Sequence, residues 1–244
     1  MKKQLIIYFA SLIFSFVSFG QDTKSDTVNR IDASGKKQGY WKKIVNDTLL
    51  YEGYFKDDKP VSLFKHYYPD NKIKAISQFS CDSKFCSTTM YFPNGKKEAE
   101  GFYTNSKKDS VWKYYTDDDT LIAEEHYKNC VINGVWKFYY MDGKINQEVT
   151  WVNGVRNGPW KMYYSDGMLR SECNIINNKT EGLFKFYYPS GKVFMSGIYK
   201  AGLKDGVWMQ FSEEGIGTLK ETYKDGVLLK SEDLNPSDKD QQKK

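Results

Sequence analysis

The feature that most constrains this 244-residue chain is an aromatic motif that returns every 24 residues. The segment GVWKFYYMDGK at 134–144 returns as GPWKMYYSDGM at 158–168 and as GLFKFYYPSGK at 182–192. With the Trp of the first segment as position 1, eight units share one phase, apart from a first spacing of 23 residues. Position 1 holds Trp41, Phe64, Thr88, Trp112, Trp136, Trp160, Phe184 and Trp208. A period of this length predicts an array in which each unit packs only on its neighbours.

Within a unit, aromatic residues alternate with turn signals. Position 4 holds Ile44, Tyr67, Tyr91, Tyr115, Tyr139, Tyr163, Tyr187 and Phe211. Positions 6 to 8 hold turn residues such as Met141-Asp142-Gly143, and a second turn follows at pairs such as Asn153-Gly154. The aromatic and β-branched content favours strands. We therefore predict an all-β fold, an elongated antiparallel β-hairpin array of about 16 strands in sequential meander order.

The two faces of this sheet are left open by the sequence. Alternation along a strand places positions 1 and 3 on one face and positions 2 and 4 on the other. Because positions 1 and 4 are both aromatic, either both faces carry aromatic columns or a bulge changes the phase. Position 2 is Lys in six units, and an acid recurs at position 13 as Glu100, Glu124, Glu148 and Glu172. We expect these acids to pair with Lys on adjacent strands.

The first 20 residues have the pattern of a secretory signal peptide. Lys2 and Lys3 precede an apolar run from Leu5 to Val17, and small residues stand at Ser18 and Gly20. The run is shorter than the roughly 20 residues of a membrane span, although an uncleaved anchor is the alternative. We expect cleavage after Gly20 and an exported protein, periplasmic, at the cell surface or secreted, with no transmembrane span in the mature chain.

The remaining boundaries follow from the repeat and from composition. We predict an N-terminal linker at 21–38, eight repeats at 39–230 and a disordered polar tail at 231–244. Lys and Arg outnumber Asp and Glu by 36 to 31 and alternate with them, which argues against a nucleic-acid partner.

No group of residues predicts catalysis. The two histidines, His66 and His126, lie in different units, and no phosphate loop, nucleophile elbow or carboxylate pair is present. We therefore expect no enzyme activity, no metal and no cofactor. Asp117-Asp118-Asp119 could suggest calcium, but it falls where other units have Asp-Gly, so we favour a turn.

Unit 3 departs most from the pattern. Thr88 replaces the Trp, and the segment SCDSKFCS at 80–87 replaces the preceding Asn-Gly turn. We expect a disulfide between Cys81 and Cys86. Cys130 and Cys173 should not bridge, because about four strands, or nearly 20 Å, separate their units, whereas a bridge needs Cα atoms within about 7 Å. The staple could compensate for the lost aromatic ring, or the gap at Thr88 could be where a partner docks.

One unit resembles the MORN repeat, in the variant found in the bacterial antitoxin-like repeat family. The matching residues are Gly134, Trp136, Tyr139, Tyr140, Asp142, Gly143, Glu148, Trp151, Asn153 and Gly154. The resemblance covers about 39–227. It implies a β-hairpin array and a scaffold for protein or lipid contacts, and the antitoxin label implies an inhibitor of a partner protein.

We therefore expect a non-catalytic exported scaffold for protein–protein interaction at the cell envelope. A carbohydrate- or wall-binding aromatic array is the first alternative, which burial of both aromatic columns would disfavour; an antitoxin-like inhibitor is the second. We also expect units 1 and 8 to act as caps, so that Trp136 contributes more stability than Trp41 or Trp208.

Overall fold

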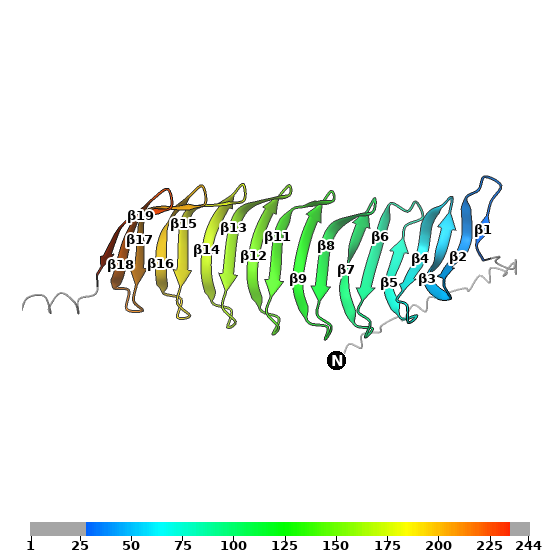
Figure 1. Cartoon of the computed structure of the whole chain (residues 1–244), viewed down its shortest axis with the longest axis horizontal. Helices are drawn as coiled ribbons and strands as arrows, with labels where there is room; N and C mark the ends of the chain where they lie inside the picture. The colour runs from blue at the N-terminus through cyan, green and yellow to red at the C-terminus, as the bar shows by residue number, and fades with distance from the viewer. Residues whose placement is uncertain (1–27, 235–244) are drawn as a thin grey trace, which may run out of the picture.

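The structure, a computed structural model that describes residues 28–234, is one open antiparallel sheet of 19 strands. The strands follow one another in chain order along the long axis of the molecule, from β1 at one end to β19 at the other (Figure 1). The predicted meander of hairpins is confirmed. The strands are β1 (Arg30–Ile31), β2 (Lys37–Val45), β3 (Thr48–Lys56), β4 (Lys59–Tyr67), β5 (Ile73–Phe79), β6 (Phe85–Tyr91), β7 (Lys97–Thr104), β8 (Lys107–Tyr115), β9 (Leu121–Lys128), β10 (Val131–Ile132), β11 (Gly134–Tyr139), β12 (Ile145–Val152), β13 (Val155–Tyr163), β14 (Leu169–Ile176), β15 (Lys179–Tyr187), β16 (Val193–Lys200), β17 (Leu203–Phe211), β18 (Gly217–Lys224) and β19 (Val227–Asp233).

Three strands exceed the expected set. β1 falls inside the predicted linker, β10 is separated from β11 only by Asn133, and β19 extends the array past unit 8. The segment from 231, expected to be disordered, thus begins as strand as far as Asp233. The predicted signal peptide and residues 235–244 lie outside the described residues. In the part that is described, no helix is long and apolar enough to cross a membrane.

Both turns of each unit use residues with positive φ, as their sequences predict. Position 8 has φ 83° at Gly143, 61° at Asn71 and 70° at Asp119. The second turn has two such residues in succession, for example Asn153 at 49° and Gly154 at 84°. Two consecutive positive φ values are the mark of type I′ hairpin turns, whose twist matches that of the strands.

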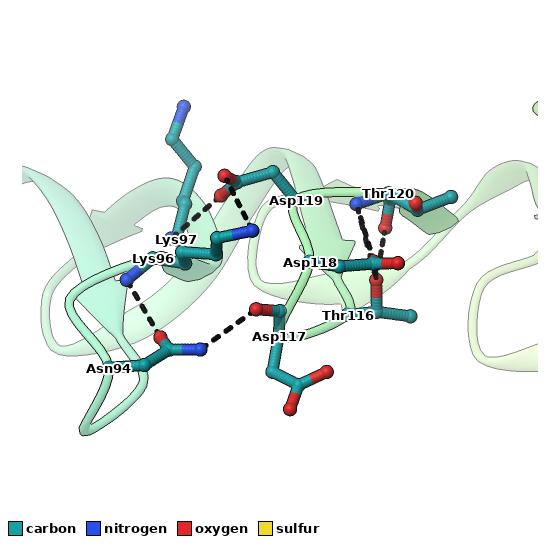
Figure 2. Close-up of polar contacts among 8 residues, drawn as sticks. All are labelled: Asn94, Lys96, Lys97, Thr116, Asp117, Asp118, Asp119 and Thr120. Atoms are coloured by element: carbon teal, nitrogen blue, oxygen red, sulfur yellow. Dashed lines mark hydrogen bonds and ion pairs between the residues drawn. The ribbon is translucent and has the colours of Figure 1, made fainter.

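The segment Asp117–Asp119 is a turn that links two units (Figure 2). Asp119 accepts a hydrogen bond from the backbone N–H of Lys97 at 3.2 Å, and the Asn94 side chain donates to the carbonyl of Asp117 at 2.8 Å. Thr116 donates to Asp118 within the turn. These contacts support the turn interpretation, and among residues 28–234 no group of three or more His, Cys, Asp or Glu is placed to hold a metal ion.

Each face carries its own aromatic column, and bulges are present as well. Trp136 lies opposite Val149 and Lys137 opposite Glu148, so odd positions share one face and even positions the other. We call the face with positions 1, 3, 12, 14 and 16 the tryptophan face. The face with positions 0, 2, 4, 13 and 15, where position 0 directly precedes position 1, is the lysine face. The register shifts after position 3 in the hairpins, as between Phe138 and Tyr139.

The core lies entirely on the tryptophan face. The buried side chains of residues 28–234 all occupy its positions, with position −1 added for one cysteine: Phe64, Ser77, Cys86, Thr88, Ala99, Trp112, Val149, Ser171, Cys173, Ile175 and Trp208. A single sheet buries them because rings from successive strands pack on one another. The Trp208 ring lies 5.8 Å from that of Phe184 and 5.0 Å from that of Tyr199, between ring centroids.

Glycine at position 14 decides which ring is fully buried. A Cβ atom on Gly101 would lie 2.4 Å from the Trp112 ring, and one on Gly197 would lie 2.2 Å from Trp208. These two indoles are 0% and 2% exposed. Trp136, which follows Glu125 at position 14, is only half-buried. The expectation that Trp208 is less enclosed than Trp136 is therefore wrong.

Candidate binding surfaces

The lysine face is organised by a ladder of Lys, Glu and Tyr. The Tyr163 hydroxyl donates to Glu148 at 2.8 Å, and the Lys137 ammonium lies 3.9 Å from the same carboxylate. The tyrosine bond repeats at Tyr67–Glu52 (2.7 Å), Tyr115–Glu100 (2.6 Å), Tyr139–Glu124 (2.9 Å) and Tyr187–Glu172 (2.6 Å). The expected Lys–acid pairing is confirmed, for example at Lys113–Glu124 (3.6 Å).

Sequence reasoning missed the tyrosine half of this ladder, although a signal for it exists. Each bonded pair is 15 residues apart. Where Ile76 or Ser196 replaces the acid, no such pair forms, and in the second case the later residue is Phe211 in place of Tyr.

The electrostatics of the ladder keep its hydroxyls protonated. Burial, followed by the hydrogen bond to glutamate, raises the pKa of Tyr67, Tyr139, Tyr163 and Tyr187 to about 12. Hydrogen bonds from Tyr40 and Tyr67 lower the pKa of Glu52. Near neutral pH these tyrosines are neutral donors and Glu52 is an ionised acceptor, so the ladder is a structural network that also gives the face its charge pattern.

An exposed apolar stripe runs along the same face at positions 0 and 15. Its members are Tyr54, Leu63, Phe102, Val135, Leu183, Ile198 and Val207, each more than a third exposed. Leu183 lies directly opposite Ile198, so the stripe continues from strand to strand. Beside it is a shallow groove of about 400 Å³ lined by Pro159, Leu183 and the stems of Lys161 and Lys185, among others. A contiguous apolar patch with a polar rim is typical of an interaction surface.

The opposite face has a hollow of about 300 Å³ at unit 3. It is lined by His66, Ala75, Ser77, Phe79, Ser83, Lys84, Cys86, Thr88, Met90, Tyr103 and Ser106. Thr88 lies at its floor, bonded to Ser77 between the two hydroxyl oxygens at 2.9 Å and 3.2 Å from the sulfur of Cys86. The predicted gap in the aromatic column is thus a hollow in the structure.

The backbone explains why unit 3 differs. In other units the residue two before position 1 has positive φ, as in Gly134 at 112° and Ser110 at 58°, and it forms a bulge. Strands β5 and β6 pair without any register shift, from Ala75–Met90 to Phe79–Cys86. The residues that other units place in the bulge lie here in the longer turn between these strands.

The structure does not contain the expected bridge between Cys81 and Cys86. All four cysteines are free thiols; Cys81 is exposed in the turn, whereas Cys86 is buried on the tryptophan face beside Thr88. Cys130 lies in a type I′ turn with φ 66°, and Cys173 is buried under position 14.

The predicted repeat-core aromatics divide into two groups. Phe64, Trp112 and Trp208 are buried, whereas Trp41, Trp136, Trp160, Phe184 and the position 4 tyrosines are half-buried. Neither column is fully buried, so this criterion does not remove the carbohydrate alternative.

Comparison with known proteins agrees with this geometry. The MORN repeat variant matches residues 88–105, 108–129, 132–153, 156–177 and 180–201. These matches show that residues 88–201 belong to the MORN repeat variant family, a class of β-hairpin repeat arrays.

Other comparisons add little. No curated protein matches the chain. A solved structure, the Photorhabdus luminescens Tc holotoxin pore with the mutation TccC3-D651A, is similar at 11% identity and a TM-score of 0.22, over 80% of this chain. The chain spans 11% of that chain's length.

Proposed function

We propose that this chain is a non-catalytic exported repeat scaffold that binds a protein partner at the cell envelope. The observation that carries the proposal is the apolar stripe on the lysine face. Repeat arrays present long continuous surfaces, and this one combines exposed aliphatic side chains with flanking Lys and Glu. Leu183, Ile198 and Val207 are aliphatic and offer no ring for stacking on sugars, which favours a protein over a glycan.

The test is capture of envelope proteins by the purified protein and two variants. Leu183→Lys/Val207→Lys places two charges in the stripe, at side chains that are 51% and 47% exposed, so the fold should tolerate both. Ile216→Lys is the matched control, because Ile216 is 57% exposed but lies in a tight turn away from the stripe.

We expect one partner to be retained by the wild type and by Ile216→Lys, and to be reduced at least roughly tenfold by the stripe variant. Equal capture by all three would contradict the stripe as the interface. Retention of envelope polysaccharide in place of protein would support the carbohydrate alternative. Export is tested separately by the mass of the mature protein, which should begin at Gln21.

A further inference from the structure

The units beside unit 3 show what fills the equivalent place elsewhere. Phe64 in unit 2 and Trp112 in unit 4 occupy position 1, and each contacts a ring at position 16. The centroids of Phe64 and Phe79 are 6.1 Å apart, and those of Trp112 and Tyr103 are 4.8 Å apart. Phe79 and Tyr103 also line the hollow at Thr88. Its walls are therefore side chains that already pack on an aromatic ring next door.

A cation accompanies the ring in other units. The residue four before position 1 is Lys37, Lys108 or Lys204 in three units. Their ammonium groups lie 4.9 Å from Trp41, 4.8 Å from Trp112 and 4.4 Å from Trp208, measured to the ring centroid. Lys84 holds this place in unit 3 and lines the hollow, but Thr88 offers it no ring. An exposed ammonium at the rim is electrostatically complementary to the negative face of an aromatic ring.

The floor of the hollow is suited to an indole. Elsewhere the indole N–H donates to a carbonyl freed by the bulge, as from Trp112 to Phe102 at 2.9 Å. Unit 3 has no bulge, and its floor presents the hydroxyls of Ser77 and Thr88, which are 7% and 6% exposed. A hydroxyl that shares one hydrogen bond still has acceptor capacity. The volume, about 300 Å³, is at the lower end of the range for ligand pockets.

We infer that the hollow at Thr88 receives a tryptophan side chain of the protein partner, with the indole seated between Phe79 and Tyr103 and covered by the Lys84 ammonium. The inference rests on the proposed function for the existence of a protein partner. It adds a second contact, on the opposite face from the apolar stripe, and gives it a chemical class. The indole would complete the aromatic column that the chain's own sequence interrupts.

The experiment measures binding of N-acetyl-L-tryptophanamide to the mature protein by NMR, under reducing conditions. A single ring of this size should bind with a dissociation constant on the order of millimolar. We expect saturable shifts confined to residues around unit 3, and none with N-acetyl-L-leucinamide. Lys84→Met should weaken binding about two- to fivefold, whereas Lys72→Met, an exposed lysine in a tight turn, should not change it.

Thr88→Trp fills the hollow from within and should reduce probe binding at least tenfold. If that variant does not fold, the comparison of Lys84→Met with Lys72→Met decides. Absence of saturable binding, equal binding by Thr88→Trp, or equal binding of the leucine probe would overturn the inference. Because Leu183→Lys/Val207→Lys leaves the hollow intact, loss of envelope capture with unchanged probe binding would count against the stripe alone.

Discussion

At the scale of single residues, the depth of each ring on the tryptophan face depends on the side chain it crosses. Gly53, Gly101 and Gly197 have no Cβ, so the following ring lies directly against the backbone. Where position 14 is Glu125 or Val149, the following tryptophan stands off and keeps partial exposure. Because close-packed interiors do not absorb an added methyl freely, these glycines are a structural requirement.

Gly101→Ala should destabilise the protein by about 1–3 kcal/mol, since the new Cβ would overlap the Trp112 ring. Cys173→Ala changes the same repeat position in front of Phe184 without adding volume, and we expect it to cost less. Urea unfolding followed by tryptophan fluorescence measures both. A Gly101→Ala variant as stable as the wild type would show that the indole shifts at no cost.

Thiol reactivity separates the free-cysteine structure from the bridged alternative. Cys81 is exposed and should react first with a thiol reagent, whereas Cys86 and Cys173 are buried. Burial raises the pKa of Cys173 to about 11, so its reactive thiolate is scarce near neutral pH. We expect Cys81 to be labelled in the native protein, and Cys86 and Cys173 only after unfolding. A peptide map of the exported protein linking Cys81 to Cys86 would contradict the free-thiol arrangement.

At the scale of the hairpin, the sequence predicts the strands and turns because their signals are local and repeated. Asp-Gly and Asn-Gly stand at fixed positions, so the meander follows from the period alone. The bulge is less visible, because the residue with positive φ is Gly134 in one unit and Ser62 or Ser110 in others. The missing Trp at Thr88 indicates a gap, but the hydroxyl floor depends on the unbulged register between β5 and β6, which no single residue encodes.

The ladder on the lysine face should contribute to stability through its charged hydrogen bonds. Tyr163→Phe removes the donor to Glu148 and should cost about 1 kcal/mol, below the full value for a bond to a charged group because the site is half-buried. Tyr91→Phe is the matched control, since the residue 15 before Tyr91 is Ile76. The difference between the two unfolding free energies is the measurement. Equal costs would mean that the hydroxyl bonds contribute nothing beyond the rings.

The same tyrosines predict an alkaline limit to stability. Their pKa in the folded state is raised above the ordinary value of about 10, to about 12 for Tyr67, Tyr139, Tyr163 and Tyr187. Their contribution is therefore complete below about pH 10 and is lost as the pH rises towards 12. Unfolding free energies measured from pH 8 to 12 should fall over this interval, with tyrosinate absorbance rising alongside. In Glu148→Gln, the Tyr163 titration should move to lower pH; an unmoved titration would contradict the ladder.

At the scale of the whole molecule, the array is a one-dimensional stack in which each strand pairs only with its sequence neighbours. Unit 8 is not a weak cap, because β19 pairs with β18 and the Trp208 ring contacts those of Phe184, Tyr199 and Tyr223. Unit 1 is more open, with Ile44 60% exposed at position 4. In such a stack, stability is a sum of unit and neighbour terms, so the position of a defect decides how far its effect spreads.

This gives a prediction for two equally buried tryptophans. Trp112→Ala and Trp208→Ala should each remove about 3–5 kcal/mol of local stability, while Trp136→Ala and Trp41→Ala cost less because those indoles are half-buried. The two large losses should spread differently. A defect at Trp112 interrupts coupling between both halves, whereas one at Trp208 loosens only the end of the stack.

Native-state hydrogen exchange resolves this difference by strand. Trp208→Ala should lose amide protection in β17 to β19 and keep it in β6 to β9, so global unfolding by urea should shift little in midpoint but begin earlier. Trp112→Ala should lower protection on both sides of β8 and shift the midpoint of the main transition. Uniform loss of protection along the whole sheet in both variants would show that the array unfolds as one cooperative block, with stability shared over all its units.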